Sequence, residues 1–136
     1  MKPLIPGNIL QRNCKRINNE YVHLEYLNMK KLIDFTVTEN KRLNHDTILL
    51  VLHSDELPEI QPGQFVNVRV DHSPSTFLRR PISVHDVDEA RGLLYLFIKI
   101  VGCGTSTLGD LQIGDKVNVM LPLGNHFSIP ASGRPL

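Results

Sequence analysis

The stretch Leu93–Thr105, with the sequence LLYLFIKIVGCGT, decides the fold of this chain. Its first nine residues are apolar on both faces of a strand, apart from Lys99. Such a pattern is typical of a central strand that is covered on each side. Two glycines and a threonine follow at once, which favours a strand-to-helix turn. We therefore predict a buried strand over Leu93–Val101 that leads directly into a helix.

Five further segments also have the pattern of strands. In Gln64–Val70, three valines share one face while Asn67 and Arg69 share the other, which is typical of a half-buried strand. Turn residues, such as Pro62 and Gly63, separate the segments. The predicted strands are Asp34–Glu39, Thr47–His53, Gln64–Val70, Ile82–Val87, Leu93–Val101 and Lys116–Leu121.

One short helix fits among these strands. It is expected between Thr105 and Leu111, with Thr105 or Ser106 as its N-cap, because hydroxyl side chains satisfy the free amides of a helix start. Six short strands with regular turns and a single helix favour a closed antiparallel barrel over a sandwich. The fold class predicted from the residues is therefore all-β.

The composition is that of one folded domain. The chain has 136 residues, 41% hydrophobic and 21% charged, which is an ordinary globular balance. A formal net charge of +1 gives no global attraction to nucleic acid or to an anionic membrane, so neither is an expected partner. No stretch approaches the roughly 20 apolar residues of a membrane helix, and we expect a cytoplasmic location. Cys14 and Cys103 are too few for a disulfide framework or a four-cysteine cluster.

The motif Arg80-Pro81-Ile82-Ser83 stands at the entry of the fourth predicted strand. Pro81 suits a strand entry and pushes Arg80 into an extended conformation. An extended arginine at a strand mouth can offer its planar fork to two phosphate oxygens. Ser83 lies on the same face as Pro81 and can present a hydroxyl toward the mouth. A solvated arginine, a strand-entry proline and an edge serine are the alternative, which these four residues alone would favour.

The motif Gly102-Cys103-Gly104-Thr105 supplies a second candidate element for the same anion. Glycines let backbone N–H groups approach a phosphate closely, and a helix start carries positive partial charge. A tight turn with positive φ and an N-cap is the alternative, and it would be favoured for this motif alone. Because one small barrel carries both motifs, the pair favours a diphosphate site.

Over roughly residues 32–130 the chain resembles the FAD-binding domain of the ferredoxin–NADP reductase superfamily. The likeness is carried by Arg80–Ser83, Leu94–Thr105, Leu111–Asp115 and Leu121–Phe127. Within the superfamily it is greatest to the electron-transfer subunits of bacterial dihydroorotate dehydrogenases. The resemblance implies a six-stranded antiparallel Greek-key barrel with one short capping helix, and FAD as the cofactor.

The resemblance also implies which residues bind the cofactor. Arg80 would bind the FAD diphosphate, and Ser83 would lie by the reactive edge of the isoalloxazine. The backbone of residues 97–99 would line the ribityl and flavin region, and Gly104 with Thr105 would hold phosphate at the helix start. The complete set of expected cofactor-binding residues is Arg80, Pro81, Ile82, Ser83, Phe97, Ile98, Lys99, Gly102, Gly104 and Thr105.

The expected domain organisation has two parts. Residues 1–28 are an N-terminal extension whose order the sequence leaves open, with an arm packed on the barrel as the alternative. Residues 29–136 are the FAD-binding barrel. The resemblance places an NAD-binding domain and a [2Fe-2S] cluster after the barrel in the full subunit, and this chain shows no site for either.

The expected function is that of an FAD-binding electron-transfer flavoprotein domain. In the complete enzyme it would relay electrons from dihydroorotate oxidation toward NAD, although the domain alone is not expected to be a competent enzyme. The resemblance implies the dihydroorotate dehydrogenase catalytic subunit as partner, with a homodimer inside a heterotetramer. The alternatives are a cofactor-free barrel that acts as a docking or assembly module, and another ferredoxin-reductase-like flavin reductase subunit.

Overall fold

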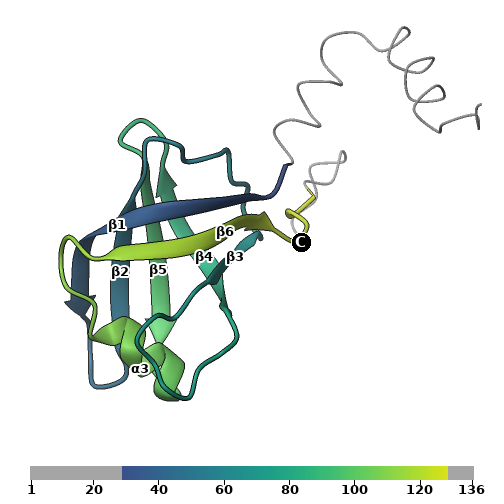
Figure 1. Cartoon of the computed structure of the whole chain (residues 1–136). Helices are drawn as coiled ribbons and strands as arrows, with labels where there is room; N and C mark the ends of the chain where they lie inside the picture. Colours follow the sequence, from purple (N-terminus) through teal and green to yellow (C-terminus); the bar gives the residue numbers. More distant parts are fainter. Residues whose placement is uncertain (1–28, 129–136) are drawn as a thin grey trace, which may run out of the picture.

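The computed structural model describes residues 29–128, so the expected extension over residues 1–28 lies outside the described residues. The described chain forms six strands and one helix (Figure 1). The strands are β1 (Lys31–Arg42), β2 (Thr47–His53), β3 (Phe65–Val68), β4 (Arg80–Asp88), β5 (Leu93–Lys99) and β6 (Lys116–Leu123). The helix is α3 (Cys103–Gly109).

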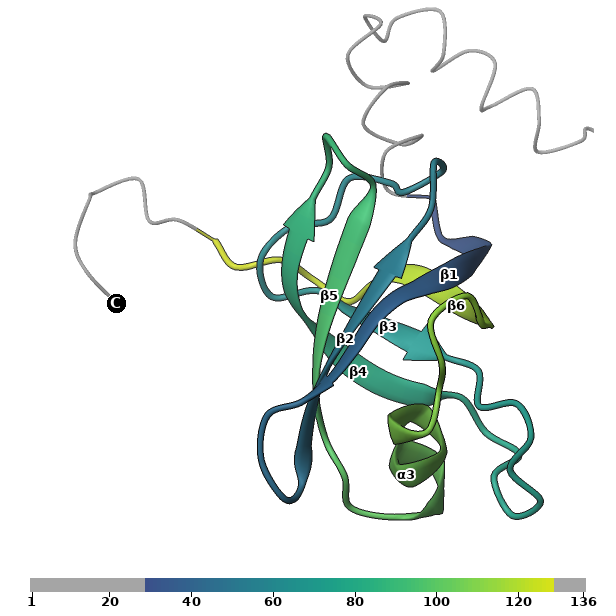
Figure 2. The ribbon, with the colours of Figure 1, turned by 90° about the vertical axis from the view of Figure 1, so that its left-hand side faces the viewer.

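The six strands close into a barrel in the order β1-β2-β5-β4-β3-β6, with every neighbouring pair antiparallel. Strands β3, β4 and β5 form a meander, and β6 and β2 flank it on its two sides, which is a Greek-key arrangement. Helix α3 lies at one end of the barrel, in the connection between β5 and β6 (Figures 1 and 2). For residues 29–128, the prediction of a six-stranded antiparallel Greek-key barrel with one short helix is confirmed.

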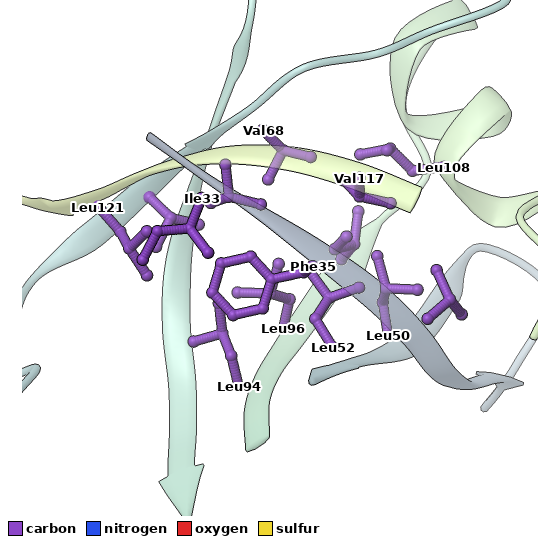
Figure 3. Packing of buried hydrophobic residues seen from close by; sticks show 14 of the residues in the cluster. Ile33, Phe35, Leu50, Leu52, Val68, Leu94, Leu96, Leu108, Val117 and Leu121 are labelled. Carbon is purple, nitrogen blue, oxygen red and sulfur yellow. The ribbon is translucent and has the colours of Figure 1, made fainter. Parts of the chain in front are cut away.

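Alternating side chains fill the inside of this barrel. On β1, the side chains of Ile33, Phe35 and Val37 are buried, because side chains along a strand alternate between its two faces. Phe35 lies in the middle of the cluster, surrounded by leucines of β2 and β5 (Figure 3). Leu108 of α3 belongs to the same cluster, so the core fixes the helix against the barrel end.

Strand β4 begins two residues earlier than predicted. Arg80 and Pro81 are part of the strand and pair with Val68 and Asn67 of β3. The Val84 N–H donates to the carbonyl oxygen of Gln64, on the side of β3. Backbone N–H groups of successive residues point to opposite sides of a strand, so the nitrogen of Pro81, three residues earlier, faces β5. The ladder between β4 and β5 ends at Val84, and no β5 residue there requires the N–H that proline lacks.

Strand β5 is covered on one face only, contrary to the prediction of a strand buried on both sides. Leu94, Leu96 and Ile98 are buried, whereas Phe97 is 50% exposed and Val101, just past the strand, is 79% exposed. The barrel interior accepts only the inward face of each strand. An apolar outer face on β5 is therefore available to a ligand or a partner.

Helix α3 begins earlier than expected, at Cys103, with Gly102 and not Thr105 or Ser106 as its N-cap. Thr105 is the third helical residue, and its Oγ1 accepts hydrogen bonds from the N–H groups of Val101 and Gly102 at 2.9 and 3.2 Å. The hydroxyl thus bonds amides ahead of the helix from inside its first turn. Thr105 therefore stabilises the start of the helix from its third helical position, whereas an N-cap residue would do so from the position before the helix.

Candidate functional site

The two sequence motifs meet at the α3 end of the barrel. A Cβ placed on Gly104 would lie 2.8 Å from Nε of Arg80 and 3.2 Å from Cγ2 of Thr76. The first residue of β4 therefore lies directly against the first turn of α3. The β3–β4 loop, which carries Thr76, runs beside the helix in both views (Figures 1 and 2).

The close approach of Arg80 explains the glycine at position 104. Neither Gly102 nor Gly104 has positive φ, and Gly102 is extended with φ −172°, so the positive-φ turn considered as the alternative is not what the backbone adopts. A side chain at position 104 would collide with the Arg80 side chain, whereas a Cβ at position 102 would meet nothing within 4 Å. The absence of a side chain at Gly104 leaves the space that the Arg80 side chain needs.

Arg80 differs from the other four arginines in the described part of the chain. Arg42, Arg69, Arg79 and Arg91 each donate to an oxygen of another residue. No hydrogen bond or ion pair within residues 29–128 engages the half-buried Arg80 side chain. A guanidinium held in place without a protein partner is suited to bind an external anion, because its planar fork matches phosphate oxygens.

Arg79, its neighbour, has a structural role that sequence reasoning missed. Its Nη1 donates to the carbonyl oxygens of Asn67 and Asn118, at 3.3 and 3.1 Å, and its Nη2 donates to the Asn118 side chain. These bonds tie the entry of β4 to β3 and β6 and so hold Arg80 at the barrel rim. The pair of adjacent arginines was the only signal for this role in the sequence.

Lys99, the other cation among the expected site residues, is already paired. Its Nζ lies 3.5 Å from Oδ2 of Asp46. The pKa of Asp46 is lowered, chiefly by the hydrogen bond from the Thr47 hydroxyl and then by the charges of His45 and Lys99. Since Asp46 is ionised at neutral pH, it offsets the charge of Lys99. Arg80 is left as the unpaired cation of the expected set.

Strands β4 and β5 separate within β4, four residues beyond Arg80. Their last pair is Val84 with Leu96, and Ser83 and Phe97 are the next residues on the two strands. Both residues are exposed, and the Phe97 ring lies 5.7 Å from the ring of His85, tilted by 38°. The backbone beyond the last pair has no partner strand on this side. Its N–H and C=O groups are available to a ligand along the seam.

Two of the expected site residues do not present side chains to this seam. Ile98 is buried in the core, and Ile82 is half-buried and packs against it, so each could reach a ligand only through its backbone. Pro81 is exposed on the same face as Ser83. Sequence reasoning missed Thr76, which is buried and lies against Gly104. Nothing in the sequence of the loop distinguishes this threonine from its neighbours.

A separate cavity, with a volume of about 700 Å³, lies between α3, β6 and the end of β3. Asp34, Asp71 and Asp115 line it. Arg69 and Lys116 also line it, but the carboxylates outnumber them and Arg69 is already paired with Asp71 at 2.9 Å, so the cavity is a poorer phosphate site than the α3 end. Within residues 29–128, no three His, Cys, Asp or Glu side chains gather closely enough to hold a metal ion. No helix in the same range has the length and apolarity needed to cross a membrane.

Solved structures with the same fold define the class of protein. The barrel is similar to an NADH-dependent reduced ferredoxin–NADP oxidoreductase, with 29% identity and a TM-score of 0.62 over 69% of this chain and 34% of that one. The cytochrome b5 reductase domain of Ulva prolifera nitrate reductase shares the fold at 23% identity and a TM-score of 0.61, over 74% and 44% of the two chains. The chain therefore has the barrel of the ferredoxin-reductase-type flavin domains.

The family follows from the sequence comparison. The model of the oxidoreductase FAD-binding domain matches residues 34–127, and the chain belongs to this family. It is similar to the electron transfer subunit of dihydroorotate dehydrogenase B (NAD(+)) from Desulforamulus reducens, at 37% identity over 77% of this chain, and from Bacillus caldolyticus, at 38% over 74%. The chain spans about two fifths of the length of these relatives, 40% and 41%. The expected cofactor, FAD, is that of the family.

The residues at the α3 end fit the diphosphate of this cofactor. The unpaired Arg80 guanidinium would supply the positive charge, and the bare Cα of Gly104 leaves room for the Arg80 side chain against the start of α3. At seven residues, α3 is two turns long, so its individual N–H groups matter more than a summed helix dipole.

Proposed function

We propose that this chain is the FAD-binding part of an electron-transfer subunit, which relays electrons from dihydroorotate oxidation toward NAD in the complete enzyme. The main support for an FAD site is the unpaired guanidinium of Arg80, which lies against the Cα of Gly104. The choice of enzyme is supported by the identity of 37% to a relative named as the electron transfer subunit of dihydroorotate dehydrogenase B.

In this proposal, each part of the site has a separate task. Bound FAD supplies the redox chemistry, taking up and releasing electrons at its isoalloxazine. Arg80 binds the diphosphate in a two-point contact, with Gly102, Gly104 and Thr105 forming the wall behind it. Arg80 would thereby hold the cofactor at the rim of the barrel.

The seam between β4 and β5 orients the flavin. Ser83 presents its hydroxyl by the reactive edge, and the open backbone of residues 97–99 binds the polar edge of the ring system and the ribityl chain. Arg80-Pro81-Ile82-Ser83 acts here as one extended segment, because the pairing of β4 with β3 fixes its direction. The exposed apolar faces of Phe97 and Pro81 exclude water from the flavin.

The proposed partner is the catalytic subunit of a dihydroorotate dehydrogenase, in the cytoplasm. A homodimer of the electron-transfer subunit within a heterotetramer belongs to the same proposal. Val101, which lies just past β5 and is 79% exposed, offers an apolar contact for such assembly that the flavin does not use in this proposal.

The test is direct binding of FAD by the purified chain. We expect FAD to bind at micromolar concentration, and we expect Arg80→Ala to weaken it by about 10-fold or more, since hydrogen bonds from a charged group contribute roughly 1.5–3 kcal/mol. Arg91→Ala is the matched control, because Arg91 is exposed and pairs with Asp88 in the β4–β5 hairpin. Equal FAD affinity in wild type and Arg80→Ala would refute the site.

The partner is tested by capture of the dihydroorotate dehydrogenase catalytic subunit, with and without FAD. Capture that depends on FAD is the expected result. Capture that is indifferent to FAD, from a chain that binds no flavin, would instead support the docking module. Flavin binding without any capture would favour another flavin reductase subunit.

A further inference from the structure

Phe77, in the β3–β4 loop, is the most exposed large hydrophobic side chain among residues 29–128, at 91%. Its ring takes part in no ring contact, because the one such contact in the described part of the chain joins His85 and Phe97. An aromatic ring that is fully open to solvent on both faces can stack on a planar ligand at no cost in displaced protein contacts.

Hydrogen bonds anchor residues on both sides of Phe77 along the chain. On one side, the Thr76 N–H donates to the Ser73 carbonyl at 3.4 Å, and the Ser73 hydroxyl donates to Oγ1 of Thr76 at 2.8 Å. On the other side, Arg79 is bonded to β3 and β6. Phe77 therefore stands between two anchored residues, and less conformational entropy is lost when a ligand binds to it.

Phe77 also lies beside the proposed diphosphate position. Thr76 packs against Gly104, with Cγ2 3.2 Å from where a Cβ would be, and Phe77 is the next residue along the chain. Consecutive Cα atoms are about 3.8 Å apart, so the Phe77 backbone lies within one residue of the wall of the site.

The covalent structure of FAD determines which part of the cofactor can contact Phe77. The diphosphate is the middle of the molecule: the flavin leaves it in one direction and the adenosine in the other. In the proposed function, on which this inference rests, the flavin extends along β4 toward Ser83. The adenosine must then leave toward the loop that precedes Arg80, and a single ribose separates its adenine from the phosphate.

We infer that Phe77 is the stacking platform for the adenine of FAD, and that it determines the preference of this domain for FAD over FMN. FMN has the same flavin but no adenosine, so it cannot use the ring. The 700 Å³ cavity is the competing destination for adenosine, but its lining holds three carboxylates against two cations, Arg69 and Lys116, which disfavours the phosphate that the adenosine would bring with it.

The experiment compares FAD and FMN binding to the full chain by flavin fluorescence. Stacking of a base on an aromatic side chain predicts that Phe77→Ala weakens FAD by about fivefold or more, with FMN affinity unchanged. Ile113→Ala, a substitution of another exposed apolar residue in the α3–β6 loop, should change neither affinity.

A second measurement detects the adenine alone. The chain contains no tryptophan, so Phe77→Trp introduces a single indole as a reporter, and AMP should quench its fluorescence. The inference is overturned if Phe77→Ala leaves the ratio of FAD to FMN affinity unchanged. It is also overturned if the indole fluorescence of Phe77→Trp does not respond to AMP at millimolar-range excess over the protein. Either result would leave FAD binding itself intact. If the wild type binds neither flavin, the proposed function itself is refuted, and this inference with it.

Discussion

Replacement of Gly104 by alanine is expected to weaken binding of the cofactor without weakening the fold. The new Cβ would lie 2.8 Å from Nε of Arg80. Non-bonded heavy atoms prefer about 3.5–4.0 Å, so the guanidinium must move by roughly 0.7 Å or more. The nearest atom is the middle of a flexible side chain and not backbone, so Arg80 can yield without distortion of the barrel.

The size of the effect follows from this displacement. A hydrogen bond of about 2.8 Å that is lengthened by roughly 0.7 Å leaves the hydrogen-bonding range. At least one charge-assisted bond to the diphosphate is then lost, which corresponds to roughly 1.5–3 kcal/mol, or about 10- to 100-fold in the Kd of FAD. Stability should change little, because alanine in a helix is favoured over glycine by about 0.5–1 kcal/mol, which offsets the crowding.

The assay measures FAD affinity by titration and stability by thermal unfolding without flavin. Gly109→Ala is the matched control: it lies at the other end of α3, where a Cβ would meet only Cδ1 of Ile100, at 3.2 Å. The reasoning is wrong if Gly104→Ala binds FAD as tightly as wild type. It is also wrong if Gly104→Ala loses affinity only in step with a drop in Tm, because the glycine would then serve the fold.

Three further outcomes follow from the same contacts. Arg79→Ala should lower the free energy of unfolding by about 1–3 kcal/mol in chemical denaturation, because three hydrogen bonds are lost, whereas Arg80→Ala should leave it nearly unchanged. Phe35→Ala should cost about 3–5 kcal/mol in the same measurement, since the ring is fully buried in the barrel. The hydrogen bond from Arg91 lowers the pKa of Asp88, so the stabilisation from this pair is present at neutral pH and is lost as the pH falls from about 4; the Tm of Asp88→Asn should depend less on pH over that range than the Tm of wild type.

The outer face of β5 shows where pattern reasoning reaches its limit. The apolar run Leu93–Val101 predicts a strand, and β5 occupies most of it. The same run predicts cover on both sides, yet Phe97 and Val101 are exposed. An apolar side chain is stabilised when it is removed from water, and a bound ligand or a partner can cover it as well as a protein core can. The sequence pattern does not distinguish these three.

Much of the barrel was determined by the sequence, because the period of two in side-chain burial and the turn residues act between near neighbours along the chain. The motifs of the site could be found in the same way, since each is a run of four residues. Only the tertiary structure decided that Arg80 lies against Gly104, that Arg79 is bonded while Arg80 is not, and that Thr105 serves the helix from inside its first turn. These contacts depend on strand register and on barrel closure, which bring together residues from separate elements, and no local pattern specifies which atoms meet there.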